Sequence, residues 1–244
     1  MIFYPLGKYI LLLKAVFRKP EKWSIYRKEI FKEMNEIGVG SLGIIVIISV
    51  FLGAVTTVQT AFQLVSDLVP KSFIGGIVRD SSILELCPTI CAIVLAGKIG
   101  SSIASQIGTM RVTEQIDALE IMGINSPGYL ILPKITAAVT MIPLLIIISV
   151  CVSIFGGYLT VISSEVIAPQ TFIEGLNDNF VPFTLTVCIT KSLIFAFIIS
   201  SVAAYQGFYT QGGALEVGQA STKAVVISCI MILFSDYVIA KLML

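Results

Sequence analysis

Five long apolar stretches, separated by polar segments, set the pattern of this chain. A bilayer core needs about 20 consecutive, mostly apolar residues for each helix that crosses it. The stretches that meet this requirement are residues 40–65, 81–107, 129–162, 182–205 and 222–243. The third is the longest, and Pro133 and Pro143 within it predict a bend or a portion outside the bilayer core. The pattern predicts an all-α integral membrane protein with five transmembrane helices.

Composition supports this fold class. Of the 244 residues, 56% are hydrophobic and only 13% are charged, against about 25% charged residues in a soluble domain. The mean hydropathy is +0.96. A net charge of +1 indicates neither a nucleic-acid-binding surface nor an acidic one. The chain has no histidine, which excludes imidazole metal ligands and histidine-based catalysis. Its five cysteines all lie in apolar stretches, so we expect packing roles and no metal site or disulfide framework.

Basic residues concentrate before the first span. Residues 1–39 hold eight of the sixteen Lys and Arg residues, whereas the connection 163–181 holds none. Cytoplasmic segments of membrane proteins carry the excess of basic residues. We therefore expect the N-terminus and the connections 108–128 and 206–221 in the cytoplasm, and the C-terminus on the opposite side. Lys71 and Arg79 are the exceptions on the outer side.

The segment before the first span predicts two short helices. Apolar residues at helical spacing, with Lys and Arg on other faces, indicate a helix that lies in the membrane interface; they are Leu6, Ile10, Leu13 and Phe17. Pro20 breaks this helix, and a second helix of mixed charge, about 21–37, leads into the first span. We expect residues 1–39 to form a cytoplasmic interfacial segment and residues 40–244 to form the five-span domain.

A short acidic, amphipathic helix, about 113–122, separates the second and third stretches. Its apolar stripe consists of Val112, Ile116, Leu119 and Met122. Thr113 is a candidate N-cap, and Glu114 and Asp117 follow where the helix dipole favours acidic groups. Gly123 is a natural stop. Such a helix is either an ordinary loop helix at the membrane surface or a docking helix for a soluble partner with a basic groove.

The apolar stretches contain the ionisable residues Glu85, Lys191 and Asp236. Charges within a bilayer are costly, so they pair with one another or line a polar cavity. At about 1.5 Å per residue, Lys191 and Asp236 fall at similar depths from the outer ends of their spans, and Glu85 lies in the same half. Both an ion pair and a role in a cavity remain open.

The first span has a polar face of Ser49, Thr56, Thr57, Gln59, Thr60 and Gln63. Thr56, Thr60 and Gln63 follow the i, i+4, i+7 spacing that places side chains on one side of a helix. Packing against a neighbouring helix explains such a face. The alternative is the lining of a pocket for a lipid headgroup.

Two blocks of sequence resemble permease subunits of the MlaE/YrbE type. The first runs Gly97-Lys98-x-Gly100-Ser101, Gly108-Thr109-Met110 and Thr113-Glu114-Gln115-x-Asp117-Ala118-Leu119-x-x-Met122-Gly123. The second runs from Gly207 through Gly212-Gly213-Ala214 and Val217-Gly218 to Ala220-Ser221-Thr222-Lys223. The similarity covers nearly all of the chain. Departures from the family pattern are Leu84 before Glu85, Gln106 in place of a glutamate, and Lys98 and Lys134 where arginine is common.

The resemblance implies the membrane subunit of an Mce-family ABC transporter, which moves phospholipids between bacterial inner and outer membranes. It implies a homodimer, a cytoplasmic ATPase subunit and a periplasmic Mce-domain, MlaD-like partner. Residues implied in coupling to the ATPase are Thr113, Glu114, Gln115, Asp117, Ala118, Leu119, Met122 and Gly123. Candidates for an outward-facing lipid cavity are Thr56, Thr60, Gln63, Glu85, Lys191 and Asp236.

The chain itself offers no nucleotide-binding motif. Gly97-Lys98 lacks the glycine spacing of a phosphate-binding loop and lies within an apolar stretch. We therefore expect no catalysis and no cofactor of its own, with ATP used by the partner subunit. Two other hypotheses are a secondary transporter driven by protons through Glu85 or Asp236, and a membrane scaffold for an Mce-type partner. The sequence shows no clear internal repeat of the kind common in secondary transporters.

Overall fold

Helices account for all the regular structure of the described residues, and no strand occurs among them. The computed structural model describes residues 3–17, 23–64, 70–164 and 167–243. The elements in chain order are α1 (Phe3–Val16), α2 (Trp23–Gln63), α3 (Phe73–Ser81), the π-helical η1 (Ser82–Ile90), α4 (Cys91–Leu95), the π-helical η2 (Ala96–Gly100), α5 (Ser101–Val112), α6 (Gln115–Ile121), α7 (Ser126–Ser164), α8 (Pro169–Asn177), α9 (Phe183–Phe208) and α10 (Ala214–Met243). Five helical segments are long and apolar enough to cross a membrane. The predicted all-α fold with five candidate spans is confirmed.

Four of the five candidate spans begin earlier than the apolar stretches do, and the fourth begins at Phe183, one residue later than predicted. The helix predicted at 21–37 and the first span form one continuous helix, α2, and the second span extends over Phe73–Val112. An apolar stretch marks only the part of a helix that hydrocarbon would surround. The helix itself continues into polar residues until a turn ends it, because the backbone N–H and C=O groups of each helical turn form hydrogen bonds with those of the next turn. The predicted break at Pro20 lies outside the described residues.

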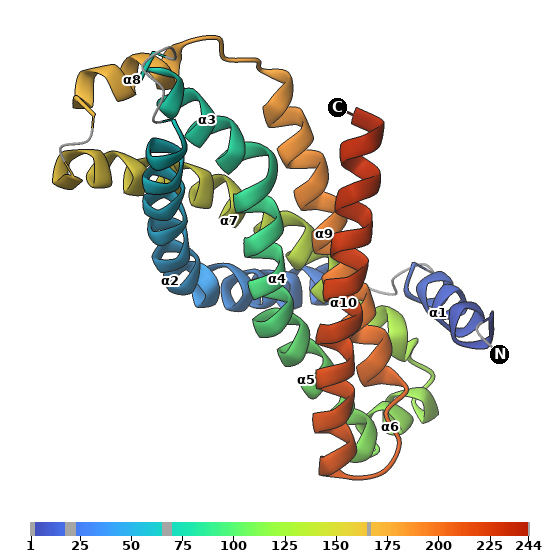
Figure 1. Ribbon diagram of the computed structural model, residues 1–244. Coiled ribbons are helices and arrows are strands. Elements are labelled where there is room, and N and C mark those ends of the chain that lie inside the picture. The colour runs from blue at the N-terminus through green and yellow to red at the C-terminus, as the bar shows by residue number, and fades with distance from the viewer. Residues whose placement is uncertain (1–2, 18–22, 65–69, 165–166, 244) are drawn as a thin grey trace.

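The two ends of the helical bundle carry different elements. Helix α6 and the turn between α9 and α10 lie at one end, and α8, the start of α3 and the C-terminus lie at the other (Figure 1). The first half of α2 runs across the direction of α10, and its second half turns toward α3 (Figure 1). The arrangement follows from five candidate spans joined in antiparallel succession.

Helices α2 and α7 cross at very short range because glycines face each other there. A Cβ atom on Gly53 would lie 1.7 Å from the carbonyl oxygen of Ser153, and one on Gly156 would lie 2.4 Å from that of Val50. Side chains at these positions would push the helices apart. Small residues are the means by which helix backbones approach closely in lipid. Pro133 and Pro143 are accommodated within α7, which continues as a helix through both.

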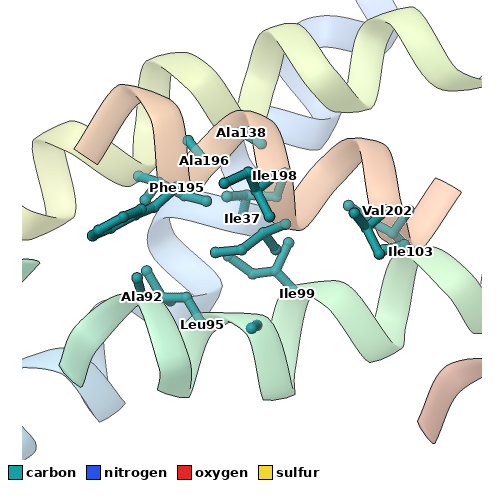
Figure 2. Packing of buried hydrophobic residues seen from close by; sticks show 14 of the residues in the cluster. Ile37, Ala92, Leu95, Ile99, Ile103, Ala138, Phe195, Ala196, Ile198 and Val202 are labelled. Atoms are coloured by element: carbon teal, nitrogen blue, oxygen red, sulfur yellow. The ribbon is translucent and has the colours of Figure 1, made fainter. Parts of the chain in front are cut away.

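Helix α9 lies at the centre of the bundle. Of its most apolar window 72% is buried, against 17% for α10. Figure 2 shows the side chains that pack around it. They are Phe195, Ala196, Ile198 and Val202 of α9, with Ala92, Leu95, Ile99 and Ile103 of the second span, Ile37 of α2 and Ala138 of α7. The same core also includes Ala224, Ile232 and Ile239 of α10, so all five candidate spans contribute to it.

Helix α1 forms as predicted and packs on this bundle through a second face. Leu12 and Val16 are buried, whereas Leu6, Ile10 and Phe17 are exposed. The Tyr9 hydroxyl lies 2.8 Å from the Ser201 hydroxyl of α9, and the Asn125 amide donates to the carbonyl oxygen of Ala15 at 3.0 Å. Leu13, the fourth residue of the apolar face found in the sequence, is partly buried and packs against the core, so only Leu6, Ile10 and Phe17 of that face remain available to lipid.

Candidate functional site

Glu85, Lys191 and Asp236 meet at one buried ammonium group. Lys191 of α9 lies with Nζ 2.7 Å from Asp236 Oδ1 of α10 and 3.0 Å from Glu85 Oε1 of η1. It also donates a hydrogen bond of 2.8 Å to the carbonyl oxygen of Leu84. The Lys191 side chain is 0% exposed, that of Asp236 is 15% exposed and that of Glu85 is 49% exposed. The predicted pairing of Lys191 with Asp236 is present, and Glu85 joins it.

The two carboxylates of this charged triad (Glu85, Lys191 and Asp236) interact with the ammonium group in different ways. Glu85 accepts a hydrogen bond from Lys191. Asp236 Oδ1 is close enough for strong Coulombic attraction but lacks hydrogen-bond geometry. A buried ammonium group without a counter-charge would carry a large desolvation penalty. The triad therefore joins η1, α9 and α10 electrostatically, and half of the Glu85 side chain remains open to the surroundings.

The polar face of the first span divides between two environments. Ser49 is buried and donates to the Ser149 hydroxyl of α7 at 2.8 Å. Thr56 donates to the carbonyl oxygen of Leu52 in its own helix at 2.6 Å. Thr60 is buried and Gln63 is exposed at the end of α2. Packing between helices thus explains Ser49.

Thr56, Thr60 and Gln63 are not joined to the charged triad. No hydrogen bond among the described residues links any of the three to Glu85, Lys191 or Asp236. The structure brings the three charged residues of the predicted cavity together, and no hydrogen bond among the described residues joins the threonines and the glutamine to them. Their part in a lipid cavity stays a prediction.

The amphipathic helix between the second and third spans is α6, and it begins later than predicted. Thr113 ends α5, and its hydroxyl donates to the carbonyl oxygen of Thr109 at 2.8 Å. The prediction of Thr113 as N-cap is wrong, because the preceding helix already uses that hydroxyl. Glu114 precedes α6 with a φ of 60° in the left-handed region. Gly123, with a φ of +79°, ends the helix as predicted, and Ile124 N–H donates to Leu119 O at 3.0 Å.

Helix α6 is fixed on one side and open on the other. Ile116 is fully buried, Asp117 accepts a hydrogen bond of 2.6 Å from Arg111 of α5, and Glu120 accepts one of 2.7 Å from Ser126 of α7. The predicted apolar stripe therefore splits, because Met122 is 64% exposed. Together with Ile121, which is 87% exposed, it forms an apolar tip. Exposed Glu114, Gln115 and Ala118 lie beside that tip in the sequence.

A second polar network lies near the same end of the bundle, and sequence reasoning missed it. Lys134 is almost fully buried in α7, and its Nζ donates to Glu33 Oε1 of α2 and to Gln106 Oε1 of α5, both at 2.6 Å. Gln106 in turn donates to Glu36 Oε1 at 3.0 Å. The available signal was a lone lysine early in the longest apolar stretch, opposite two glutamates spaced three residues apart.

These features define the class of the protein. It is a multi-pass, all-helical membrane protein with ionised side chains buried between its candidate spans and a short, anchored helix exposed at one end. Residues 30–242 match the family described as Permease MlaE, and the chain belongs to that family.

Relatives extend over nearly the whole chain. A probable ABC transporter permease protein of Rickettsia bellii (strain RML369-C) is 36% identical over 97% of this chain and 91% of its own length. One from Synechocystis sp. is 36% identical over 90% of this chain and 83% of its own length. The Arabidopsis thaliana protein TRIGALACTOSYLDIACYLGLYCEROL 1, chloroplastic, is 31% identical over 90% of this chain and 63% of its own length. The chain is thus a permease, the membrane component of a transporter.

Proposed function

We propose that this permease is the membrane subunit of an ABC transporter that moves phospholipids between the inner and outer membranes of a bacterial envelope. It acts as a homodimer in the inner membrane, with a separate ATPase subunit and a periplasmic Mce-domain, MlaD-like protein. Membership of the MlaE permease family supports the transporter class. The name of the Arabidopsis relative refers to a galactolipid, which supports lipid as the class of substrate.

Helix α6 is the proposed contact with the ATPase, and its anchoring is the observation that carries the proposal. The ion pair of Asp117 with Arg111 and the hydrogen bond of Glu120 with Ser126 tie α6 to the helices on both sides of it. A displacement of α6 is therefore passed directly to α5 and α7. Its apolar tip, Ile121 and Met122, stays free to enter a groove of a partner. Acidic Glu114 favours a groove with basic residues.

The charged triad is the proposed polar part of the lipid path. Glu85 holds the buried Lys191 while half of its own side chain is open. Ionised carboxylates at membrane depth face a polar cavity, a headgroup or another subunit. We assign Thr56, Thr60 and Gln63 of α2 to the same outward-facing path, on the polar face that they share.

The orientation follows the distribution of basic residues. Residues 1–39, with eight of the sixteen Lys and Arg residues, are assigned to the cytoplasm together with α6. Helix α1 lies in the membrane interface with Leu6, Ile10 and Phe17 toward lipid. The C-terminus and α8 then face the periplasm, where the Mce-domain partner binds. The chain carries no cofactor of its own, and ATP is hydrolysed by the partner.

Reconstitution of the complex tests the coupling assignment. The permease is co-expressed with its ATPase, and ATP-dependent lipid transfer from proteoliposomes is measured. Glu114→Lys and Ile121→Asp are each expected to abolish most ATPase binding and transfer, because the first places a positive charge against a basic groove and the second places a charge in the apolar tip. Lys28→Glu, a charge reversal at an exposed position outside α6, is the matched control. Normal binding and transfer in both α6 variants would refute the assignment, and transfer without any ATPase would favour a secondary transporter.

A further inference from the structure

A partly open cavity of about 540 Å³ lies between α2, α5 and α7, apart from the charged triad. Its size is within the range of about 300 to 1,000 Å³ typical of small-molecule sites. The lining residues are Glu29, Lys32, Glu33, Ser105, Gln106, Thr109, Met110, Tyr129, Leu130, Pro133 and Lys134. We call it the α2–α5–α7 cavity. It adjoins α6 in sequence on both sides, so it lies at the α6 end of the bundle.

The floor of the cavity, formed by Lys134, Glu33 and Gln106, is preorganised. Lys134 is fixed by its bonds to Glu33 and Gln106, both at 2.6 Å, and the Lys134 and Glu33 side chains are only 8% and 13% exposed. A buried ion pair held by further hydrogen bonds is rigid, because movement of either partner would leave a charge uncompensated. The floor therefore presents an oriented polar surface without rearrangement, which favours binding.

The rim of the cavity offers two opposite charges that the described part of the protein does not use. Glu29 and Lys32 form no ion pair or hydrogen bond with any described side chain. They are three residues apart on α2, and so project from one face of the helix. A carboxylate attracts an ammonium group, and a lysine attracts a phosphate. The rim thus suits a ligand that carries both.

Charge balance in the cavity points to a ligand with no net charge. Two carboxylates, Glu29 and Glu33, face two ammonium groups, Lys32 and Lys134. Such a lining repels neither pole of a zwitterion, whereas it gives a purely anionic group no net attraction. The hydroxyls of Ser105 and Thr109 add donors beside it. Met110, Leu130 and Pro133 supply an apolar part of the lining, here called the apolar wall.

We propose that the α2–α5–α7 cavity binds the phosphate-and-amine headgroup of a zwitterionic membrane phospholipid. Lys32 holds the phosphate, Glu29 holds the amine, and the apolar wall receives the start of the glycerol and acyl region. The first half of α2, which carries the rim, runs across the other helices (Figure 1), as a helix at the level of lipid headgroups does. This headgroup site is distinct from the charged triad. The proposal rests on the proposed function only because it places the α6 end of the helical bundle at the inner leaflet of the membrane.

Photocrosslinking of the full chain in phosphatidylcholine nanodiscs tests the site. The probes are phosphatidylethanolamine and phosphatidylglycerol that carry the same photoreactive acyl chain, and labelled peptides are mapped by mass spectrometry. Phosphatidylethanolamine is expected to label segments 105–110 and 129–134. Glu29→Gln should lower this labelling about tenfold, as expected for loss of one charge-assisted hydrogen bond, and should not lower phosphatidylglycerol labelling, because the lining then carries a net positive charge. Lys32→Gln should lower labelling by both probes.

Controls separate the site from folding and from the proposed function. Lys28→Gln, on the same helix and outside the cavity lining, should label like the unaltered chain. Labelling of segment 56–63 reports on the outward-facing lipid path and is measured separately. The cavity site and the outward-facing path can therefore each be refuted without the other. Equal labelling in Glu29→Gln and Lys28→Gln, or no adducts on the two segments, would overturn the site. If soluble glycerophosphoethanolamine at matched concentration competes away the labelling by the phosphatidylethanolamine probe, the assignment to a membrane lipid would be overturned in favour of a free phosphoamine.

Discussion

The Nζ atom of Lys191 lies 2.7 Å from Oδ1 of Asp236, and the lysine side chain is completely removed from solvent. The two residues come from α9 and α10 and are 45 positions apart in the chain. Neither could be buried as an ion alone at a tolerable cost. Their pairing, with Glu85 as a second carboxylate, therefore fixes how α10 sits against the centre of the bundle.

Removal of the buried Lys191 ammonium group alone should lower the stability of the protein more than removal of both Lys191 and Asp236. Lys191→Ala leaves Asp236 without a counter-charge and should destabilise the protein by about 3 to 5 kcal/mol. Lys191→Ala combined with Asp236→Ala should recover part of this loss. The measurement is thermal unfolding in mild detergent, followed by fluorescence-detected size exclusion. Lys241→Ala, which removes an exposed lysine of α10, serves as control. Strictly additive effects of the two substitutions would contradict energetic coupling.

The close crossing of α2 and α7 should not tolerate a side chain in place of Gly53. Gly53→Ala places a Cβ atom 1.7 Å from a backbone oxygen of Ser153, so the helices must separate. Overpacking of this kind costs about 1 to 3 kcal/mol or more. Gly43→Ala on the same helix meets nothing within 4 Å and should be neutral or slightly stabilising. The comparison is again thermal unfolding in detergent, and equal midpoints for the two variants would show that the crossing is looser than described.

The end of α6 should depend on the backbone freedom of Gly123. Its φ of +79° is in the left-handed region, which costs a residue with a Cβ atom about 1 kcal/mol. Gly123→Ala should therefore fray α6 and accelerate hydrogen–deuterium exchange of amides 118–124. Gly97→Ala, where a Cβ atom meets nothing within 4 Å and φ is negative, is the control. Unchanged exchange in Gly123→Ala would mean that tertiary contacts alone hold the helix end.

Arg79 should be needed to hold α8 against α3. Its guanidinium group is almost fully buried and donates to the carbonyl oxygens of Leu176 and Asp178 at 2.6 and 2.9 Å, while also pairing with Asp80. Arg79→Lys keeps the charge but cannot make these bonds in the same planar geometry. Faster amide exchange in residues 169–178 is the expected result. Lys71→Gln, at an exposed position, should leave that exchange unchanged, and protection of α8 in Arg79→Lys would indicate that packing of Phe172 suffices.

The sequence determined the fold class, the five candidate spans, the stop at Gly123 and the family, because these depend on local hydropathy, backbone preference and contiguous motifs. Equal depth in adjacent spans also made the pairing of Lys191 with Asp236 predictable. Only the tertiary structure decided that Thr113 ends α5 and does not begin α6, that Ser49 packs on α7, and that Glu33, Gln106 and Lys134 share one network. Those outcomes depend on which faces of helices distant in sequence meet. Close crossings such as Gly53 against Ser153 set those faces, and hydropathy does not encode them.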